Sequence, residues 1–162
     1  MAQKDISKTL IVGLGGTGQT MIRSIKKRLL RTYGEIPSLV KFLEFDTDEI
    51  DNKTDNTPFK YYYDGETMED FKYRIDNEEF LLISNPGIEA IRRDPVCSEK
   101  LDLEKLQKVS SRLKGHGAGG YRVIGRAHFL NKSQKIIEVL RQTIDSIRAA
   151  NLTAREQGRN YN

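Results

Sequence analysis

The glycine-rich stretch LIVGLGGTGQT, residues 10–20, has the composition and spacing of a phosphate-binding loop. Gly13, Gly15 and Gly18 have the G-x-G-x-x-G spacing of a dinucleotide-binding loop. The stretch also has the spacing of a P-loop, G-x-x-x-x-G-K-[ST], with Gln19 in place of the lysine. Both loops bring backbone N–H groups and the positive end of a helix dipole to a phosphate. The stretch therefore predicts a phosphate site, and the missing lysine disfavours an ordinary P-loop NTPase.

A second glycine-rich segment, KGHGAGGYRVIGRAHF, covers residues 114–129 and also precedes a helical pattern. Two such loops suit a ligand with several phosphates held from two sides, whereas a dinucleotide unit needs only the first. Arg126 adds a fixed positive charge suited to a phosphate. The plain alternatives are a flexible linker without a ligand and a solvated surface arginine.

Hydrophobic periodicity predicts the elements that must position these loops. Residues 8–14, KTLIVGL, predict a buried parallel strand, residues 19–32 a helix, and residues 39–48, LVKFLEFDTD, a second strand. Strand, glycine loop, helix and strand form a βαβ unit with a right-handed crossover. Asp46, at the end of the second strand, fits the acidic residue that grips a ribose in dinucleotide folds, although its distance from Gly18 exceeds the usual ~20 residues.

The rest of the chain gives weaker patterns, apart from its last helix. Residues 49–57 predict a surface loop, 59–64 a strand, 66–75 a short helix and 101–113 a further helix. Isoleucine and leucine at 3.6-residue spacing predict a long helix after the second glycine segment, with Ser133 or Asn131 as its N-cap. The basic side chains of the first helix are interpreted as a solvated face: Arg23, Lys26, Lys27, Arg28 and Arg31.

Composition excludes several classes of protein. The 162 residues suit one domain, and the single cysteine, Cys97, excludes an internal disulfide framework. The net charge of +4 is too small to indicate a nucleic-acid partner. We expect no zinc site and no membrane span, with the cytoplasm as the default location.

Three motifs, in order, resemble the N-terminal part of the tubulin/FtsZ superfamily of GTPases, and more closely the large bacterial tubulin-like proteins. VGLGGTGQT resembles the first nucleotide loop, FDTDEI the second, with Asp46 in place of an asparagine, and GAGGYRVIGR the third. Val123 stands where FtsZ has a ribose-side glutamate. The resemblance implies that Asp48 lies near a magnesium ion, through water. With the fingerprint glycines, the predicted nucleotide-binding residues are Gly13, Gly15, Gly16, Thr17, Gly18, Gln19, Thr20, Asp46, Thr47, Gly117, Ala118, Gly119, Gly120 and Arg126.

The resemblance implies an α/β fold: a three-layer, Rossmann-like parallel sheet with flanking helices. It is expected to be incomplete, with residues 1–162 forming the N-terminal nucleotide-binding segment of a longer GTPase and residues 49–114 a variable insertion. It also implies GTP or GDP with Mg²⁺ as ligands and self-association of the parent protein. The superfamily's catalytic acid comes from the next subunit of a filament, so we expect no hydrolysis by this chain alone. The alternatives are a fragment of an NAD- or FAD-dependent oxidoreductase and a non-catalytic scaffold.

Overall fold

The computed structural model describes residues 6–48, 61–63, 66–68, 75–84, 87–109, 118 and 121–156. Its centre is the predicted βαβ unit: strand β1 (Thr9–Leu14), helix α1 (Gly15–Tyr33) and strand β2 (Val40–Asp46). β1 and β2 are parallel, from Thr9 opposite Val40 to Leu14 opposite Phe45. Strand β5 (Phe80–Leu82) pairs parallel with the other side of β2, so the sheet order is β1-β2-β5. The prediction of two parallel strands joined by a helix is confirmed.

Helix α1 begins four residues earlier than the periodicity indicates. It starts at Gly15 rather than Gln19, so the glycine loop is itself the first turn of the helix. The helix ends where expected, because Gly34 takes a left-handed φ of 77° and its N–H donates to the carbonyl of Leu30 over 2.8 Å. A left-handed glycine is a common helix terminator, since it has no Cβ to clash in that conformation.

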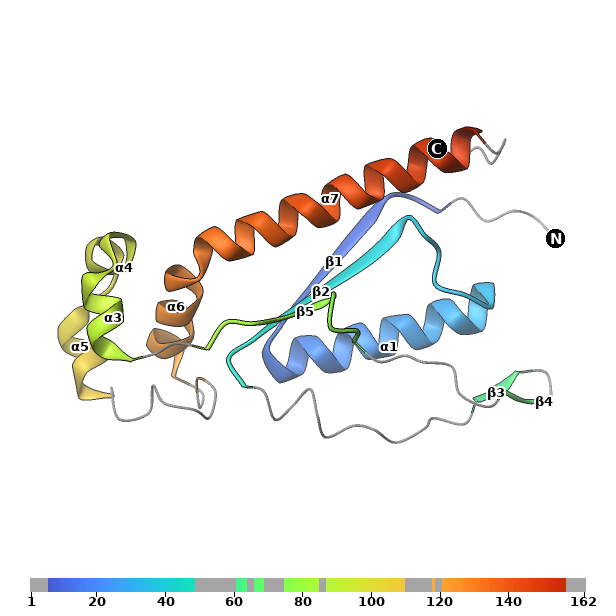
Figure 1. Cartoon of the computed structure of the whole chain (residues 1–162). Coiled ribbons are helices and arrows are strands. Elements are labelled where there is room, and N and C mark those ends of the chain that lie inside the picture. The colour runs from blue at the N-terminus through green and yellow to red at the C-terminus, as the bar shows by residue number, and fades with distance from the viewer. Residues whose placement is uncertain are drawn as a thin grey trace.

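The sheet lies between two helical layers (Figure 1). On one face, Val40 and Phe42 of β2 pack with Ile22 of α1. On the other face, Leu43 and Phe45 pack with Ile136 of helix α7 (Ser133–Glu156). Successive side chains of a strand point to opposite faces, so β2 supplies both cores. The predicted three-layer α/β class with a parallel sheet is confirmed.

A helical unit lies beyond one end of the sheet (Figure 1). It contains α3 (Ile88–Arg93), α4 (Pro95–Lys100), α5 (Leu103–Lys108) and α6 (Arg122–Asn131). Asp94 caps α4 by accepting from the N–H of Val96 and Cys97, and its second oxygen accepts from Asn131 over 3.0 Å. The unit has its own core, made of Ile91, Cys97, Leu101, Leu106, Ile124 and Ala127.

Several predictions for the middle and end of the chain need correction. The predicted strand at 59–64 is confirmed at β3 (Tyr61–Tyr63), which pairs antiparallel with β4 (Glu66–Met68). The helix predicted over 66–75 is therefore wrong at 66–68, and 69–74 lie outside the described residues. β5 lies inside the stretch expected to be an insertion, yet it belongs to the central sheet.

The helix predicted over 101–113 is shorter in the structure, and the cap predicted for the last helix is wrong. α5 ends at Lys108, and 110–113 lie outside the described residues. α7 already begins at Ser133, so this residue belongs to the first turn instead of preceding it. Asn131 uses its side-chain amide to bind Asp94, in the helical unit.

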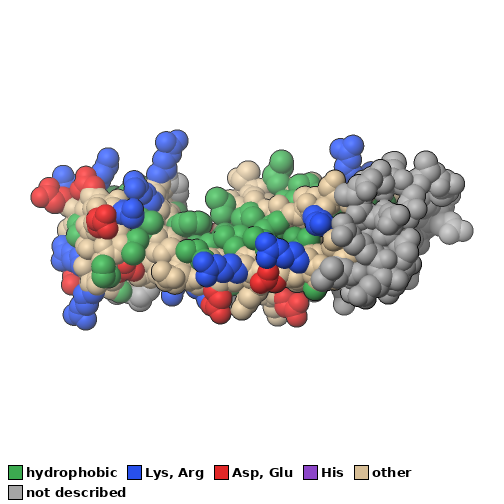
Figure 2. Space-filling model, turned by 90° about the horizontal axis from the view of Figure 1, so that it is seen from above, with side chains coloured by type: hydrophobic (Ala, Val, Ile, Leu, Met, Phe, Trp, Pro, Cys, Tyr) green, Lys and Arg blue, Asp and Glu red, His purple; other side chains and the backbone are tan. Residues whose placement is uncertain are grey.

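Within the described residues, β1 is the outermost strand of the parallel sheet. Its side chains Val12 and Leu14 are 42% and 59% exposed. Figure 2, which views the molecule from the α7 side, shows hydrophobic side chains gathered near the middle of this face. Ile137 and Ile144 of α7 are also exposed. None of the described helices is long and apolar enough to cross a membrane.

Candidate functional site at the carboxyl edge of the sheet

The first glycine loop leaves open space at the start of α1. Gly15 has a φ of 66°, and a Cβ placed on it would meet no atom within 4 Å. Among the described residues, no side chain caps this helix, and its first turn holds no acidic residue. The first N–H groups of a helix have no intrahelical acceptor, and they carry the positive end of its dipole. The loop therefore offers backbone donors to an anion.

Gly13 and Gly18 have a different role from Gly15, because they let the helix start touch the strand. A Cβ on Gly18 would lie 2.7 Å from the carbonyl carbon of Gly13, closer than real Cβ atoms come. A Cβ on Gly13 would overlap the carboxyl group of Glu44 and lie 2.9 Å from the carbonyl carbon of Gly18. These two glycines permit the close helix–strand packing that phosphate-binding βαβ units need.

The polar side chains of the first loop divide into exposed and buried ones. Thr17 and Thr20 are exposed, and the Thr20 hydroxyl donates to the carbonyl of Gly16 over 3.0 Å. Gln19 is only 5% exposed, and its Nε2 has no hydrogen-bond partner among the described residues. A buried amide without a partner is costly, so Gln19 is poised to donate to a group that enters the loop.

The second loop lies beside the first. Leu14 is opposite Phe45 in the sheet, so β1 and β2 end at the same edge. Asp46 is buried, and its Oδ1 accepts from the N–H groups of Thr47 and Asp48 over 2.6 and 3.1 Å. Its carboxylate therefore holds the turn that follows β2. In open α/β sheets, ligands bind at the carboxyl ends of the strands, which is where both loops lie.

Of the first four residues of the third loop, the structure describes Ala118 alone, and Gly117, Gly119 and Gly120 lie outside the described residues. The carbonyl of Ala118 accepts from the N–H of Tyr121 over 2.8 Å, next to the start of α6. That end of α6 is on the side of the molecule where β1 and β2 end (Figure 1). The structure thus joins the first two loops directly and places Ala118 in the helical unit.

Arg126 is an exposed side chain of α6 and lines a hollow of about 460 Å³ between α5 and α6. Lys105 and Arg122 line the same hollow, so it has a positive electrostatic character. The carboxyl group of Asp102 also lines it, and this group caps α5 by accepting from the N–H of Lys105. The predicted phosphate partner Arg126 is therefore one of several cations, held by the helical unit instead of the sheet.

Glu44 is a site residue that the sequence motifs do not indicate. Its side chain is 0% exposed, and neither carboxyl oxygen has a hydrogen-bond partner among the described residues. Burial, and after it the charge of Asp46, raise the pKa of Glu44, and the charge of Arg23 lowers it, with a net pKa of about 8. The available signal was an acidic residue inside the apolar strand pattern KFLEF, on the same face as Phe42.

Lys26 corrects the interpretation of the first helix as carrying a solvated basic face. Its side chain is 1% exposed and forms an ion pair with Glu79, just before β5. Its Nζ also lies 5.2 Å from the centre of the Phe42 ring. Glu79 in turn accepts from the N–H of Asp76 over 2.9 Å. Lys26 therefore ties α1 to the segment that leads into β5.

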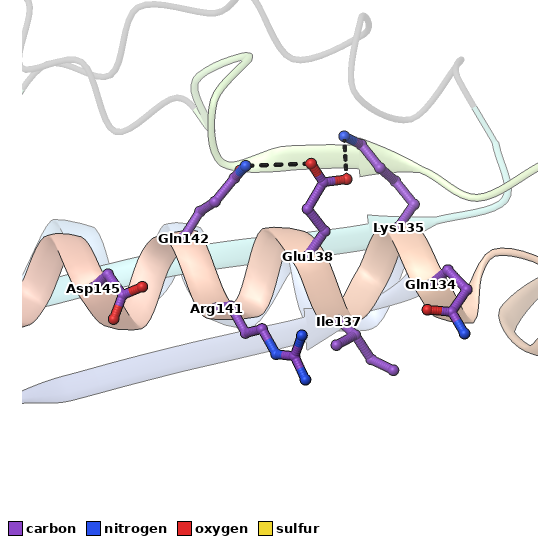
Figure 3. Close-up of a pocket in the computed structure, with 7 residues that line it drawn as sticks. All are labelled: Gln134, Lys135, Ile137, Glu138, Arg141, Gln142 and Asp145. Atoms are coloured by element: carbon purple, nitrogen blue, oxygen red, sulfur yellow. Dashed lines mark hydrogen bonds and ion pairs between the residues drawn. The ribbon is translucent and has the colours of Figure 1, made fainter.

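Another hollow, of about 500 Å³, lies along α7 and is lined by that helix alone (Figure 3). Glu138 there accepts from Lys135 over 2.8 Å and from Gln142 over 3.4 Å, one turn away in each direction. Neighbours on one helix commonly pair in this way. All the lining residues come from one helix, and no other described element forms a second wall, so this hollow is a weaker candidate site than the carboxyl edge of the sheet.

A comparison with protein families is in agreement with this geometry. A family model described as tubulin like matches residues 10–162. The chain belongs to the tubulin-like family. Comparisons with curated proteins and with solved structures returned no match. The match begins within β1 and includes both loops of this tubulin-like chain at the carboxyl edge.

The residues present fit the ligands that a tubulin-like fold implies. Gly15 leaves room for a phosphate, and the start of α1 supplies donors for it. In the described part of the chain, no group of His, Cys, Asp or Glu side chains is arranged to hold a metal ion. Mg²⁺ commonly binds through one or two carboxylates, water and substrate phosphates. Asp48, half-buried beside the first loop, is the candidate for such a carboxylate.

Proposed function

We propose that this chain binds the phosphates of GTP at the first glycine loop, as the nucleotide-binding segment of a tubulin-like GTPase. The observation that carries the proposal is the open space beside Gly15, at a helix start without a side-chain cap. A phosphate there would accept from backbone N–H groups and lie at the positive end of the α1 dipole. Thr17 and Gln19 would add side-chain contacts.

The second loop favours a nucleoside triphosphate over a dinucleotide. In dinucleotide folds, the acidic residue at the end of the second strand accepts from ribose hydroxyls. Asp46 instead directs Oδ1 to the N–H groups of its own turn and is buried. This places Asp46 as a support of the loop, next to Asp48 and Thr47, which are only partly buried.

Hydrolysis and self-association are proposed for the full-length protein. Phosphoryl transfer to water needs a positioned nucleophile as well as phosphate donors. The loops at the carboxyl edge supply the donors, and Asp48 is proposed to hold Mg²⁺ through water. In the superfamily that this chain resembles, the acid that activates water comes from a neighbouring subunit. We therefore expect the chain to bind GTP with Mg²⁺ and to release no phosphate by itself.

A titration with three ligands tests the proposed function. Fluorescent GTP, fluorescent ATP and NADH are each added to the purified chain, and binding is followed by anisotropy or by NADH fluorescence. We expect GTP to bind more tightly than NADH. Tighter binding of NADH would replace the proposal with the dinucleotide alternative, and no binding of any ligand would leave a non-catalytic scaffold.

Gly16→Val locates the binding at this loop. Gly16 lies in the first turn of α1, and a branched side chain there would occupy the space beside the phosphate. We expect at least about a tenfold loss of GTP affinity, equal to about 1.4 kcal/mol. The matched control is Thr32→Val, which places the same side chain at an exposed position near the other end of α1. Equal binding by both variants would place the site elsewhere.

A further inference from the structure

The contact between Gly13 and Gly18 has a carboxyl group against it. The Oε2 of Glu44 occupies the place that a Cβ on Gly13 would take, and it lies 3.7 Å from the place of a Cβ on Gly18. The two missing side chains therefore form a notch between β1 and α1, and Glu44 of β2 fills it. This group belongs neither to the glycine motif nor to the residues that would touch a phosphate.

The surroundings of Glu44 favour its neutral form. The side chain is completely buried, and no described hydrogen-bond donor satisfies either oxygen. An ionised carboxylate in such a place would lose its hydration without compensation. Burial is accordingly the main cause that raises the pKa of this carboxyl, and together with the charges of Asp46 and Arg23 it gives a pKa of about 8.

The charged groups around Glu44 come from each element packed against it. Asp46 lies two residues further along the same face of β2. α1 contributes Arg23, whose charge favours ionisation, and Lys26, which forms an ion pair with Glu79. β1 contributes Gly13, and β5 places Phe80 opposite Glu44, so neither neighbouring strand adds a charge there.

We propose that Glu44 is the positioning residue of the glycine loop: its neutral carboxyl group supports the contact between Gly13 and Gly18, and its ionisation weakens phosphate binding. The proton is lost to water, and the carboxylate that remains is a negative charge under the loop. It repels the phosphates and requires hydration that the closed notch does not allow. The phosphate site is thus linked to a proton that the nucleotide does not contact. The expected effect of Glu44 on GTP affinity rests on the proposed function. Its expected effect on the conformation of the glycine loop does not.

The binding of fluorescent GTP is measured from pH 6.5 to 9.5 in EDTA, so that no metal ion titrates. The variants are wild type, Glu44→Gln and the control Glu99→Gln, which makes the same change at an exposed position of α4. We expect wild type and Glu99→Gln to lose affinity about tenfold across this range, since a charge beneath the loop opposes the phosphates. Glu44→Gln, neutral throughout, should retain its affinity within about twofold. The same pH dependence in all three proteins would overturn the proposal.

A measurement without nucleotide separates this inference from the proposed function. The Cα chemical shifts of Gly13 and Gly18 are followed by NMR in the wild-type chain over the same pH range. We expect both to change together with an apparent pKa near 8, the value that burial gives Glu44. Shifts that stay constant would overturn the positioning role even if GTP binds. If the shifts titrate but no nucleotide binds, the proposed function fails, while the link between Glu44 and the loop is supported.

Discussion

The two faces of β2 both pack against apolar residues, but only the face toward α1 also buries carboxyl groups. Toward α7, Leu43 and Phe45 pack against Ile136, and Phe129 makes an edge-to-face contact with Phe45 at 6.5 Å between ring centres. Toward α1, Phe42 shares the face with Glu44 and Asp46, which are both buried. Burying apolar surface stabilises the fold, whereas burying polar groups without full pairing costs free energy. Both faces gain stability from apolar packing, and on the α1 face part of that gain is offset by the cost of burying Glu44 and Asp46 under the glycine loop.

This difference explains why the candidate site has the α1 face beneath it. The glycine loop joins β1 to α1. The side chains of β2 that contact the loop therefore come from the face of the sheet that packs against α1. The opposite face packs against Ile136 of α7 and Phe129 of α6, away from the first turn of α1, so it can be repacked without changing the groups under the loop. Changes on the two faces should therefore separate stability from binding.

The largest expected effect is on the apolar face. Phe45→Ala should lower the free energy of unfolding by about 3–5 kcal/mol, since it removes a buried aromatic ring and its contact with Phe129. Urea unfolding measures the loss, and GTP affinity at low temperature should be nearly unchanged in the folded fraction. Leu14→Ala, at an exposed position of β1, is the control and should cost less than about 1 kcal/mol. A small effect at Phe45 would mean that α7 does not stabilise the sheet.

On the polar face, Glu44 should make stability depend on pH. Its pKa is about 8 in the folded chain against 4.5 unfolded, so the folded state holds more protons between these values. The stabilisation by the neutral carboxyl group is complete below pH 4.5 and is lost as the pH rises through 8, at about 1.4 kcal/mol per pH unit between the two pKa values. Urea unfolding of wild type and Glu44→Gln at several pH values checks this. The difference between them should shift in favour of Glu44→Gln as the pH rises, and a constant difference would contradict it.

The ion pair between Lys26 and Glu79 is the next largest contribution on the α1 face. Lys26→Met should cost about 2 kcal/mol, because it removes one partner of a mostly buried pair. Adding Glu79→Gln should recover part of the loss, since the carboxylate then no longer lacks a counter-charge. The exposed pair of Lys135 and Glu138 on α7 gives the control, and Lys135→Met should change stability by less than about 0.5 kcal/mol. If Lys26→Met and Lys135→Met lowered the free energy of unfolding equally, the buried pair on the α1 face would contribute no more than an exposed pair on α7.

The smallest effect is expected at the mouth of the loop. Gly15→Ala should cost about 1 kcal/mol, because alanine is strained at a φ of 66° although no atom obstructs its Cβ. Gly125 is the opposite case, because it lies within helix α6 and an added Cβ would make an ordinary contact with the Cβ of Ala118 at 3.5 Å. Gly125→Ala should raise stability by about 0.5–1 kcal/mol. Thermal unfolding of both variants tests the assignment of Gly15 as a conformational glycine.

The βαβ unit could be predicted from the sequence because its signals are local. An apolar run, a glycine loop and a periodic helix follow one another without interruption from residue 8 to residue 32. The short helices α3 to α5 have six residues each, too few for a hydrophobic period to be recognised. The sequence does contain N-cap signals for α4 and α5, since Asp94 precedes a proline and Asp102 precedes an apolar residue.

The errors in the middle of the chain also have physical reasons. The pair Asp64-Gly65 between two short strands is a hairpin signal, and it outweighs the helical composition of the segment that follows. Glu44 and Lys26 were missed for a different reason. Their burial depends on partners distant in sequence, such as Glu79 for Lys26 and the contact between Gly13 and Gly18 for Glu44. Periodicity gives the face of a residue but not the neighbour that it meets there.

The position of β1 at the outside of the sheet has a practical consequence for handling the chain. No described strand pairs with the outer side of β1, and a row of unpaired backbone groups beside apolar side chains such as Val12 and Leu14 is a template to which another copy can add. Refolding at high concentration should therefore lose material to precipitation, because intermolecular pairing competes with folding. Dilute refolding at low temperature, with slow concentration afterwards, should raise the yield. The outer edge of β1 is therefore the feature that limits the protein concentration at which this chain can be refolded.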